Sequence, residues 1–240
     1  MTSISVELVP RSAESVLTDA ALVATYPEVT HINIPDMEKF SLRSVEAIRL
    51  IREKFGDRFV YVPHIRAIAS TFLPESFPGD IALIVQGDIP LQHKNTPQIS
   101  AIEHICELPK GIRIMAALDP YRSSLVQELA LMRAKIDAGA TGFFTQPFFS
   151  LPHMRHWVSI LPTNCEIFFG VSPITTEASL VYWRDKNHVV FPNNFSHTVS
   201  RQTAFARSVI RFAKAHDRSV YLMPIRIPLG LYLDKVFERK

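Results

Sequence analysis

The chain alternates between short apolar runs rich in β-branched residues and longer stretches in which apolar positions recur with helical spacing. The short runs are apolar nearly throughout and are bounded by turn residues, which is typical of parallel strands that are buried on both faces. We predict eight strands from these runs: Ile4–Val9, Thr30–Ile34, Phe59–Val62, Ile81–Val85, Ile112–Ala117, Gly142–Thr145, Ile167–Val171 and Ser219–Met223.

Helical patterns fill most of the intervals between these runs. Two of them open with a serine in an N-cap position, and a third ends at Gly139, a residue type that commonly follows the last turn of a helix. The interval 67–80 contains Pro74 and Pro78, so we expect the third helix to be short or missing. The predicted helices are Ser12–Thr25, Ser41–Phe55, Ser123–Ala138, Thr175–Lys186, Ser200–Ala215 and Leu229–Phe237.

Eight strands that alternate with helices predict a (β/α)8 TIM barrel with a truncated third helix. The 240 residues suit this fold, which typically needs about 250, and no linker or repeat divides them, so we expect a single barrel domain over residues 1–240. A doubly wound parallel sheet is the alternative. That fold commonly has a glycine-rich turn after its first strand, where this chain has Val9-Pro10-Arg11-Ser12.

Composition and charge narrow the class of protein. The hydrophobic content of 47% is too high for a disordered chain, and no apolar run reaches the roughly 18 residues of a membrane span. The first residues lack a secretory pattern, and Cys106 and Cys165 are too few for a disulfide framework, so we expect a cytoplasmic protein. The net charge is 26 − 23 = +3 with dispersed basic residues, so we expect no nucleic-acid binding.

Polar and titratable residues stand at or just past nearly every predicted strand end. In a (β/α)8 barrel the active site lies at the carboxyl ends of the strands, so these residues are the candidates for chemistry. They are Glu7, Asn33 with Asp36, His64 with Arg66, Gln86-Gly87-Asp88, Asp119 with Arg122, Gln146, Ser172 and Arg226.

Glu7 lies in the otherwise apolar segment Ser5–Val9, which predicts a position near the upper rim of the barrel interior. Burial raises the pKa of a carboxyl group, and a carboxylic acid that keeps its proton at neutral pH is a natural general acid. An equally weighted alternative is a structural salt bridge from Glu7 to Arg66 or Lys135.

Three further strand ends carry weaker signals. Asp88 follows Gly87, where glycine allows close approach of a ligand and the carboxylate can stabilise a developing cation, although a turn aspartate is the favoured alternative. Gln146 lies among phenylalanines and can both donate to and accept from the edge of a heterocycle, or simply satisfy a loop. His64 could bind a ring or a phosphate. It does not indicate a metal site, because no second ligand lies at a suitable spacing.

Several segments, in order along residues 5 to 174, resemble the methylenetetrahydrofolate reductase family. The most specific match is Lys135-Ile136-Asp137-Ala138-Gly139-Ala140, against Lys-Val-Asp-Ala-Gly-Ala in the family. It continues into Thr145-Gln146-Pro147-Phe148-Phe149, against Thr-Gln-Phe-Phe-Phe-Asp. Further resemblances lie at residues 5–10 (Ser-Phe-Glu-Phe-Phe-Pro-Pro in the family), 62–64, 86–90 and 170–174.

The resemblance implies an FAD-dependent barrel oxidoreductase of one-carbon metabolism and methionine biosynthesis. Such an enzyme reduces 5,10-methylenetetrahydrofolate to 5-methyltetrahydrofolate, and NAD(P)H reloads the flavin in a ping-pong scheme. The resemblance makes Glu7 the acid that protonates the folate, while Asp88 and Gln146 bind the pterin and Asp88 stabilises its cation. It matches His64, Gly87 and Lys135 to the flavin site, and it implies self-association as a family-level expectation.

The departures from the family pattern fall mostly on the flavin side. Asn33-Ile34-Pro35-Asp36 replaces Thr-Tyr-Gly-Ala, Gln86 replaces an arginine, and Arg122 ends a segment that reads Ala-Tyr-Pro-Glu-x-His in the family. We expect Asn33, Gln86 and Arg122 to face the cofactor there, with Arg122 as a phosphate contact. The alternatives are a flavin-independent or altered-carrier C1 reductase of the same barrel family, or a folate-binding subunit without catalytic activity.

Overall fold

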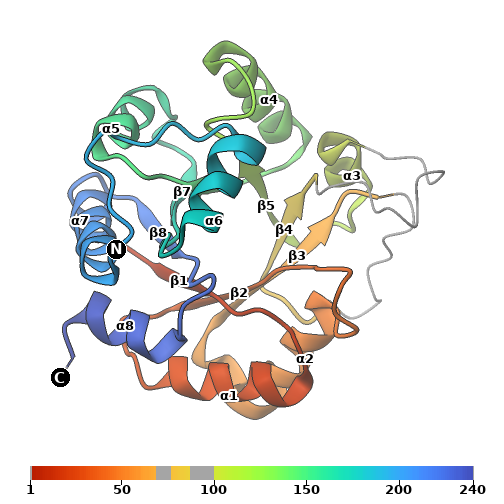
Figure 1. Cartoon of the computed structure of the whole chain (residues 1–240). Helices are drawn as coiled ribbons and strands as arrows, with labels where there is room; N and C mark the ends of the chain where they lie inside the picture. The colour runs from red at the N-terminus through yellow and green to blue at the C-terminus, as the bar shows by residue number, and fades with distance from the viewer. Residues whose placement is uncertain (1, 69–76, 87–99, 240) are drawn as a thin grey trace.

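In the computed structural model, which describes residues 2–68, 77–86 and 100–239, eight parallel strands close into a barrel in sequence order, with helices around it (Figure 1). The predicted (β/α)8 barrel is therefore confirmed, and the doubly wound sheet is wrong because the first strand pairs with the last. The strands are β1 (Ile4–Glu7), β2 (His31–Ile34), β3 (Val60–Arg66), β4 (Ile81–Val85), β5 (Arg113–Leu118), β6 (Gly142–Pro147), β7 (Glu166–Val171) and β8 (Ser219–Leu222).

Strand β3 differs most from the sequence prediction, which ended it at Val62. Pro63 has no N–H to donate, and a proline inside a run normally argues against a central strand. Here Pro63 pairs in register with Ile34, and the strand continues along β4 as far as Arg66. His64 therefore lies inside the strand instead of following it.

Helices cover the outside of the barrel, and several of them begin after a serine N-cap. Ser12, Ser124 and Ser150 each accept a backbone N–H from the first turn of the helix that follows. The helices are α1 (Ala13–Ala24), α2 (Ser44–Phe55), α3 (Ala101–Glu107), α4 (Leu125–Ala138), α5 (Leu151–Ile160), α6 (Glu177–Val181), α7 (Val199–Ala215) and α8 (Leu229–Phe237).

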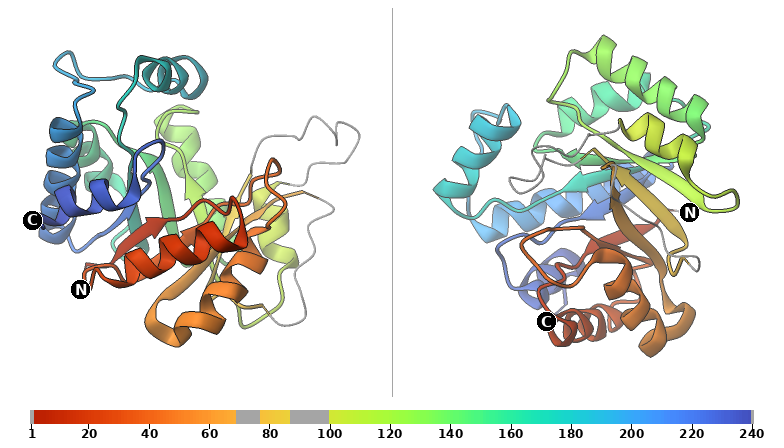
Figure 2. Two further views of the ribbon diagram at one scale, coloured as in Figure 1. Left: turned by 60° about the horizontal axis from the view of Figure 1, so that its bottom comes forward. Right: turned by 90° about the vertical axis from the view of Figure 1, so that its right-hand side faces the viewer.

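All six predicted helices form, but α2 begins at Ser44 with Arg43 as its N-cap, so the predicted serine cap at Ser41 is wrong. Helix α6 continues as a π-helical segment, η3 (Tyr182–Lys186). Two further helices of the structure, α3 and α5, lie outside the predicted set. Between β3 and β4 no helix forms in the described residues 67–68 and 77–80, as expected for a truncated third helix, while residues 69–76 lie outside the described residues. Together α6 and η3 stand apart from the ring of the other helices (Figure 2).

Two separate apolar clusters follow from the alternation of side chains along the strands. One set of alternate positions, such as Val6 and Ile32, packs outward against the helices. The other set fills the barrel: Phe144 stacks on Phe168 with ring centroids 4.2 Å apart, and His31 on β2 reaches Phe168 on β7 at 5.1 Å. Contacts between such distant strands show that the barrel is filled by side chains in the manner of its fold class.

Toward the carboxyl ends of the strands the alternation brings polar residues to the barrel interior. Glu7 and Asn33 are paired in register on β1 and β2, and His64 lies beyond Val62 on the same face of β3. Gln146 lies beyond Phe144 on β6, where the register between β6 and β7 shifts. This polar layer above an apolar interior positions the candidate site.

Among the described residues no helix is both long and apolar enough to cross a membrane.

Candidate functional site

Glu7 ends β1 and is held by Tyr221 of the neighbouring strand β8. The Tyr221 hydroxyl donates a hydrogen bond to Glu7 Oε2. Burial raises the pKa of Glu7 to about 7, and the hydrogen bond from Tyr221 opposes part of that rise. A carboxyl group with this pKa is present in both protonation states at neutral pH, as a general acid requires.

Asn33 links Tyr221 to two further interior residues. Ser5 Oγ lies 2.6 Å from Asn33 Oδ1, and Asn33 Nδ2 lies 3.3 Å from His64 Nε2. The Asn33 amide also lowers the pKa of Tyr221, as a hydrogen-bond donor to the phenol does. Burial lowers the pKa of His64 to about 3, so its imidazole is neutral. Hydrogen bonds thus join β1, β2 and β3 through Asn33, and β1 to β8 through Glu7 and Tyr221.

Glu7 does not form the alternative salt bridge to Arg66 or to Lys135. Arg66 Nε lies 3.1 Å from Asp36 Oδ2, and its Nη1 lies 3.0 Å from Glu38 Oε1. Lys135 Nζ instead donates to the backbone carbonyl of Ala117 at 2.7 Å. Within the described part of the chain neither cation pairs with Glu7, so its carboxyl group is available for chemistry.

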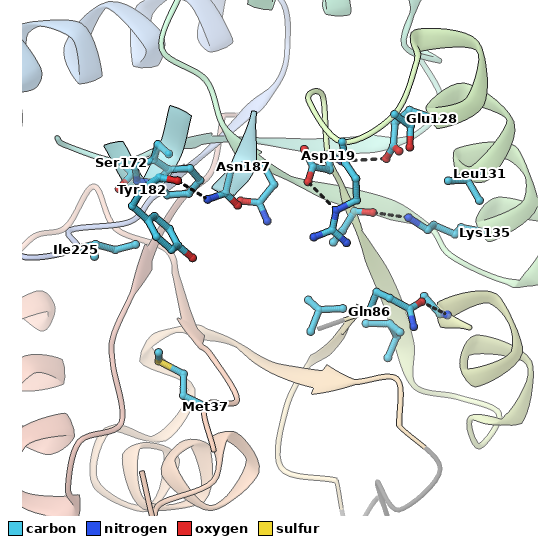
Figure 3. A pocket seen from close by; sticks show the side chains of 18 of the residues that line it. Met37, Gln86, Asp119, Glu128, Leu131, Lys135, Ser172, Tyr182, Asn187 and Ile225 are labelled. Atoms are coloured by element: carbon cyan, nitrogen blue, oxygen red, sulfur yellow. Dashed lines mark hydrogen bonds and ion pairs between the residues drawn. The ribbon is translucent and has the colours of Figure 1, made fainter. Parts of the chain in front are cut away.

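A cavity of about 790 Å³ opens at the same end of the barrel (Figure 3). Seven of the predicted residues line it together: Gln86, Asp119, Arg122, Lys135, Gln146, Ser172 and Arg226. Its volume lies within the range of roughly 300–1,000 Å³ that is usual for small-molecule and cofactor sites. The sequence prediction therefore found a substantial part of the cavity wall.

The wall formed by β5 and α4 carries a cluster of charges. Arg122 Nε lies 3.6 Å from Asp119 Oδ2, and the Asp119 backbone N–H donates to Glu128 Oε1 at 2.9 Å. Burial lowers the pKa of the Lys135 amine, and the negative charges of Glu128 and Asp119 oppose that shift. Gln86 Oε1 accepts the backbone N–H of Ala101 at 2.8 Å, so Gln86 also anchors the start of α3.

The opposite wall combines aromatic rings with hydroxyl groups and a cation. Ser172 Oγ is buried without a hydrogen-bond partner among the described residues. Arg226 has a left-handed backbone with φ of 58°, and its Nη1 lies 3.3 Å from Ser179 Oγ. Tyr182 and Trp183 of η3 complete this wall. A flat ligand with an acidic group would fit such a surface.

The predicted residues thus fall into two groups, and some lie elsewhere. Glu7, Asn33 and His64 belong to the interior network and do not line this cavity, although both groups lie at the carboxyl ends of the strands. Asn33 has no solvent-exposed surface. Gly87 and Asp88 lie outside the described residues.

Sequence reasoning missed Tyr221, Tyr182 and Trp183. Tyr221 lies within an apolar strand, so a search of strand ends does not find it. The signal that could have found it is the period of two, which places Ser219, Tyr221 and Met223 on the same face of the strand. The two η3 aromatics lie too far beyond β7 for that search. The described residues contain no cluster of three or more His, Cys, Asp or Glu side chains that could hold a metal ion.

Comparisons with known proteins support the fold and do not identify the function. No protein-family model matches the chain, and no curated protein matches it. Among solved structures it is similar to a putative deoxyribose-phosphate aldolase from Toxoplasma gondii ME49 in its apo form, with a TM-score of 0.51 and 9% identity over 100% of this chain and 95% of that one.

A second similar structure is the carboxyl transferase domain of Rhizobium etli pyruvate carboxylase with pyruvate. The TM-score is 0.54 and the identity 12%, over 93% of this chain and 40% of that chain. Both descriptions name enzymes or parts of enzymes. At these identities the likeness shows the shared fold alone, because one barrel supports many unrelated chemistries.

Proposed function

We propose that this chain reduces 5,10-methylenetetrahydrofolate to 5-methyltetrahydrofolate, with Glu7 as the general acid. The observation that carries the proposal is the Glu7 carboxyl group, which burial and Tyr221 together bring to a pKa of about 7 at the mouth of a barrel. The sequence resemblance to the methylenetetrahydrofolate reductase family supports the choice of substrate.

The chemistry requires a proton before it requires a hydride. The Glu7 O–H bond breaks as a bridging nitrogen of the substrate gains the proton. The bond from the methylene carbon to that nitrogen then breaks, and the carbon becomes part of an iminium that can accept hydride. A general acid contributes most when its pKa lies near the working pH, which Glu7 satisfies.

Cavity residues supply contacts for a folate-like molecule. The half-buried Gln146 amide offers a donor and an acceptor to the edge of a pterin. Tyr182 and Trp183 offer aromatic faces to the aryl group, and Arg226 offers a cation to the acidic tail. Asp88, which the resemblance assigns to the pterin cation, stays a prediction.

The charges along the cavity wall support FAD as the cofactor. Lys39 and Arg122 line the cavity and are cationic, as the phosphates of the cofactor require, while Gln86 and Lys135 lie on the same β4–β5 side. Arg122 is 61% exposed and can turn from Asp119 to a phosphate. When bound, the flavin would carry the hydride from NAD(P)H to the substrate carbon.

A second candidate function is direct hydride transfer from the nicotinamide without a flavin. The observation that favours it concerns Asn33 and His64, two predicted flavin contacts. Asn33 has no exposed surface and His64 is buried beside it, whereas Glu7 is partly exposed. In this function Glu7 keeps its role as the acid, and the nicotinamide takes the space of the flavin.

The test uses purified protein under anaerobic conditions with FAD, NADH and methylenetetrahydrofolate. Glu7→Gln keeps the size of the side chain and removes the acid, so we expect normal reduction of flavin by NADH and loss of its reoxidation by the folate. Glu53→Gln on the exposed side of α2 is the matched control and should behave like the unmodified protein.

The outcomes separate the candidates. Normal turnover by Glu7→Gln would show that the acid assignment is wrong. A colourless protein that transfers deuterium directly and stereospecifically from labelled NADH to the product would favour the flavin-independent function. Folate binding without any turnover would leave a binding subunit.

A further inference from the structure

The hydrogen bonds around Asn33 have only one consistent direction. Within the described residues Tyr221 is the hydrogen-bond partner of Glu7, and a phenol gives its single proton to a carboxylate in preference to an amide. Asn33 lowers the pKa of Tyr221, which agrees with donation from Asn33 Nδ2 toward the Tyr221 oxygen. This assigns the orientation of the Asn33 amide.

The rest of the network follows from that orientation. Asn33 Nδ2 has a second hydrogen, which points to His64 Nε2 at 3.3 Å, so the neutral His64 carries its proton on Nδ1. Asn33 Oδ1 accepts from Ser5 Oγ at 2.6 Å. Every donor of the Asn33 amide and the Tyr221 hydroxyl is thereby used, and the chain of hydrogen bonds ends at Glu7 Oε2.

We propose that Tyr221, held by Asn33, is the positioning residue of Glu7: it fixes Oε2, leaves Oε1 for the substrate, and stabilises the carboxylate that remains after proton transfer. The other oxygen, Oε1, has no hydrogen-bond partner among the described residues. The inference rests on the proposed function only for the identity of the molecule that receives the proton.

The surroundings of Glu7 make Tyr221 the group that controls its acidity. The titratable group on β3 is the neutral His64, and the charge of Arg66 farther along β3 faces Asp36 and Glu38. His31 on β2 lies lower in the barrel against Phe168. Burial therefore weakens Glu7 as an acid, and the hydrogen bond from Tyr221 is the opposing influence.

Tyr221→Phe tests the proposal because it removes only the hydroxyl. The ring contacts with Phe144 at 5.3 Å and with His64 at 6.4 Å remain available, so the variant should fold. We expect the pKa of Glu7 to rise by about one to two pH units, the value of a hydrogen bond to a charged group. The measurement is an NMR titration of isotope-labelled glutamate carboxyl groups, with Glu7→Gln to assign the resonance.

A matched control and an opposite change sharpen the test. Tyr232→Phe removes another buried tyrosine hydroxyl, one without a hydrogen-bond partner in the described chain, and should leave the Glu7 titration unchanged. A fluorinated tyrosine at position 221 has a more acidic phenol and should lower the pKa of Glu7. Because the fluorinated protein retains the hydroxyl, it tests the proposal even if Tyr221→Phe fails to fold.

The titration needs no substrate, so it can fail independently of the proposed function. An unchanged Glu7 pKa in Tyr221→Phe, or a fluorinated protein in which that pKa does not fall, would overturn the positioning role. The expected shifts in a protein that does not turn over folate would overturn the proposed function and leave the positioning role intact.

Discussion

At the scale of the residue, Glu7 takes its chemistry from its position. A glutamate in an apolar strand predicts a buried carboxyl group, and this much could be read from the sequence. The choice between an acid and a salt bridge could not, because it depends on where Arg66 and Lys135 point. The structure engages both elsewhere, and it supplies Tyr221 as the partner that the sequence did not indicate.

The raised pKa of Glu7 has a consequence for stability that needs no substrate. Between about pH 4.5 and about 7 the folded protein keeps a proton that the unfolded chain has released. Stability should therefore fall as the pH rises through this window, because the unfolded state binds fewer protons there. Glu7→Gln cannot ionise, so its melting temperature should fall less than that of the unmodified protein over the same window.

Thermal melts across that pH window check this expectation, with Glu53→Gln on the exposed side of α2 as the control. Equal slopes of melting temperature against pH for Glu7→Gln and the unmodified protein would contradict the raised pKa. The same experiment is blind to catalysis, so it separates the ionisation of Glu7 from its proposed role.

At the scale of the element, repeated local signals were sufficient for most of the barrel. Alternating strands and serine-capped helices follow from nearby residues and could be predicted. The continuation of β3 through Pro63 could not, because it depends on pairing with β2 and β4. That continuation matters for the site, since it turns His64 into the barrel, where burial keeps it neutral.

Close approach of β6 and β7 depends on Gly170. A Cβ at this position would lie 2.4 Å from the Thr145 carbonyl oxygen and 2.7 Å from Met223 Cε. Because the first of these is backbone, Gly170→Ala should cost about 1–3 kcal/mol, as overpacking usually does. Gly230→Ala at the start of α8 meets Leu22 at an ordinary 3.5 Å and should be neutral or stabilising.

Chemical denaturation of the two variants measures this difference. The cost for Gly170→Ala should appear as a lower midpoint with an unchanged slope. Equal stability of the two variants would mean that β6 and β7 tolerate a wider separation than the structure has.

At the scale of the whole molecule, closure of the barrel creates the site. Glu7 and Tyr221 are 214 positions apart in the sequence and become neighbours only because β1 pairs with β8. No local sequence pattern can predict a contact between residues so far apart in the chain. The same closure gathers Gln86, Arg122 and Gln146 around one cavity, which the strand-end rule did anticipate, whereas Lys135 on α4 came from the resemblance. The fold alone permits many reactions, so the function depends on the chemistry of these residues.

The most direct test of the central claim is the rate of 5-methyltetrahydrofolate formation as a function of pH. If Glu7 is the acid, the rate should fall above about pH 7, where Glu7 loses its proton. Glu7→Gln should be slower by about 100-fold or more and should lack this fall. A Glu7→Gln protein with the rate and pH profile of the unmodified protein would contradict the account.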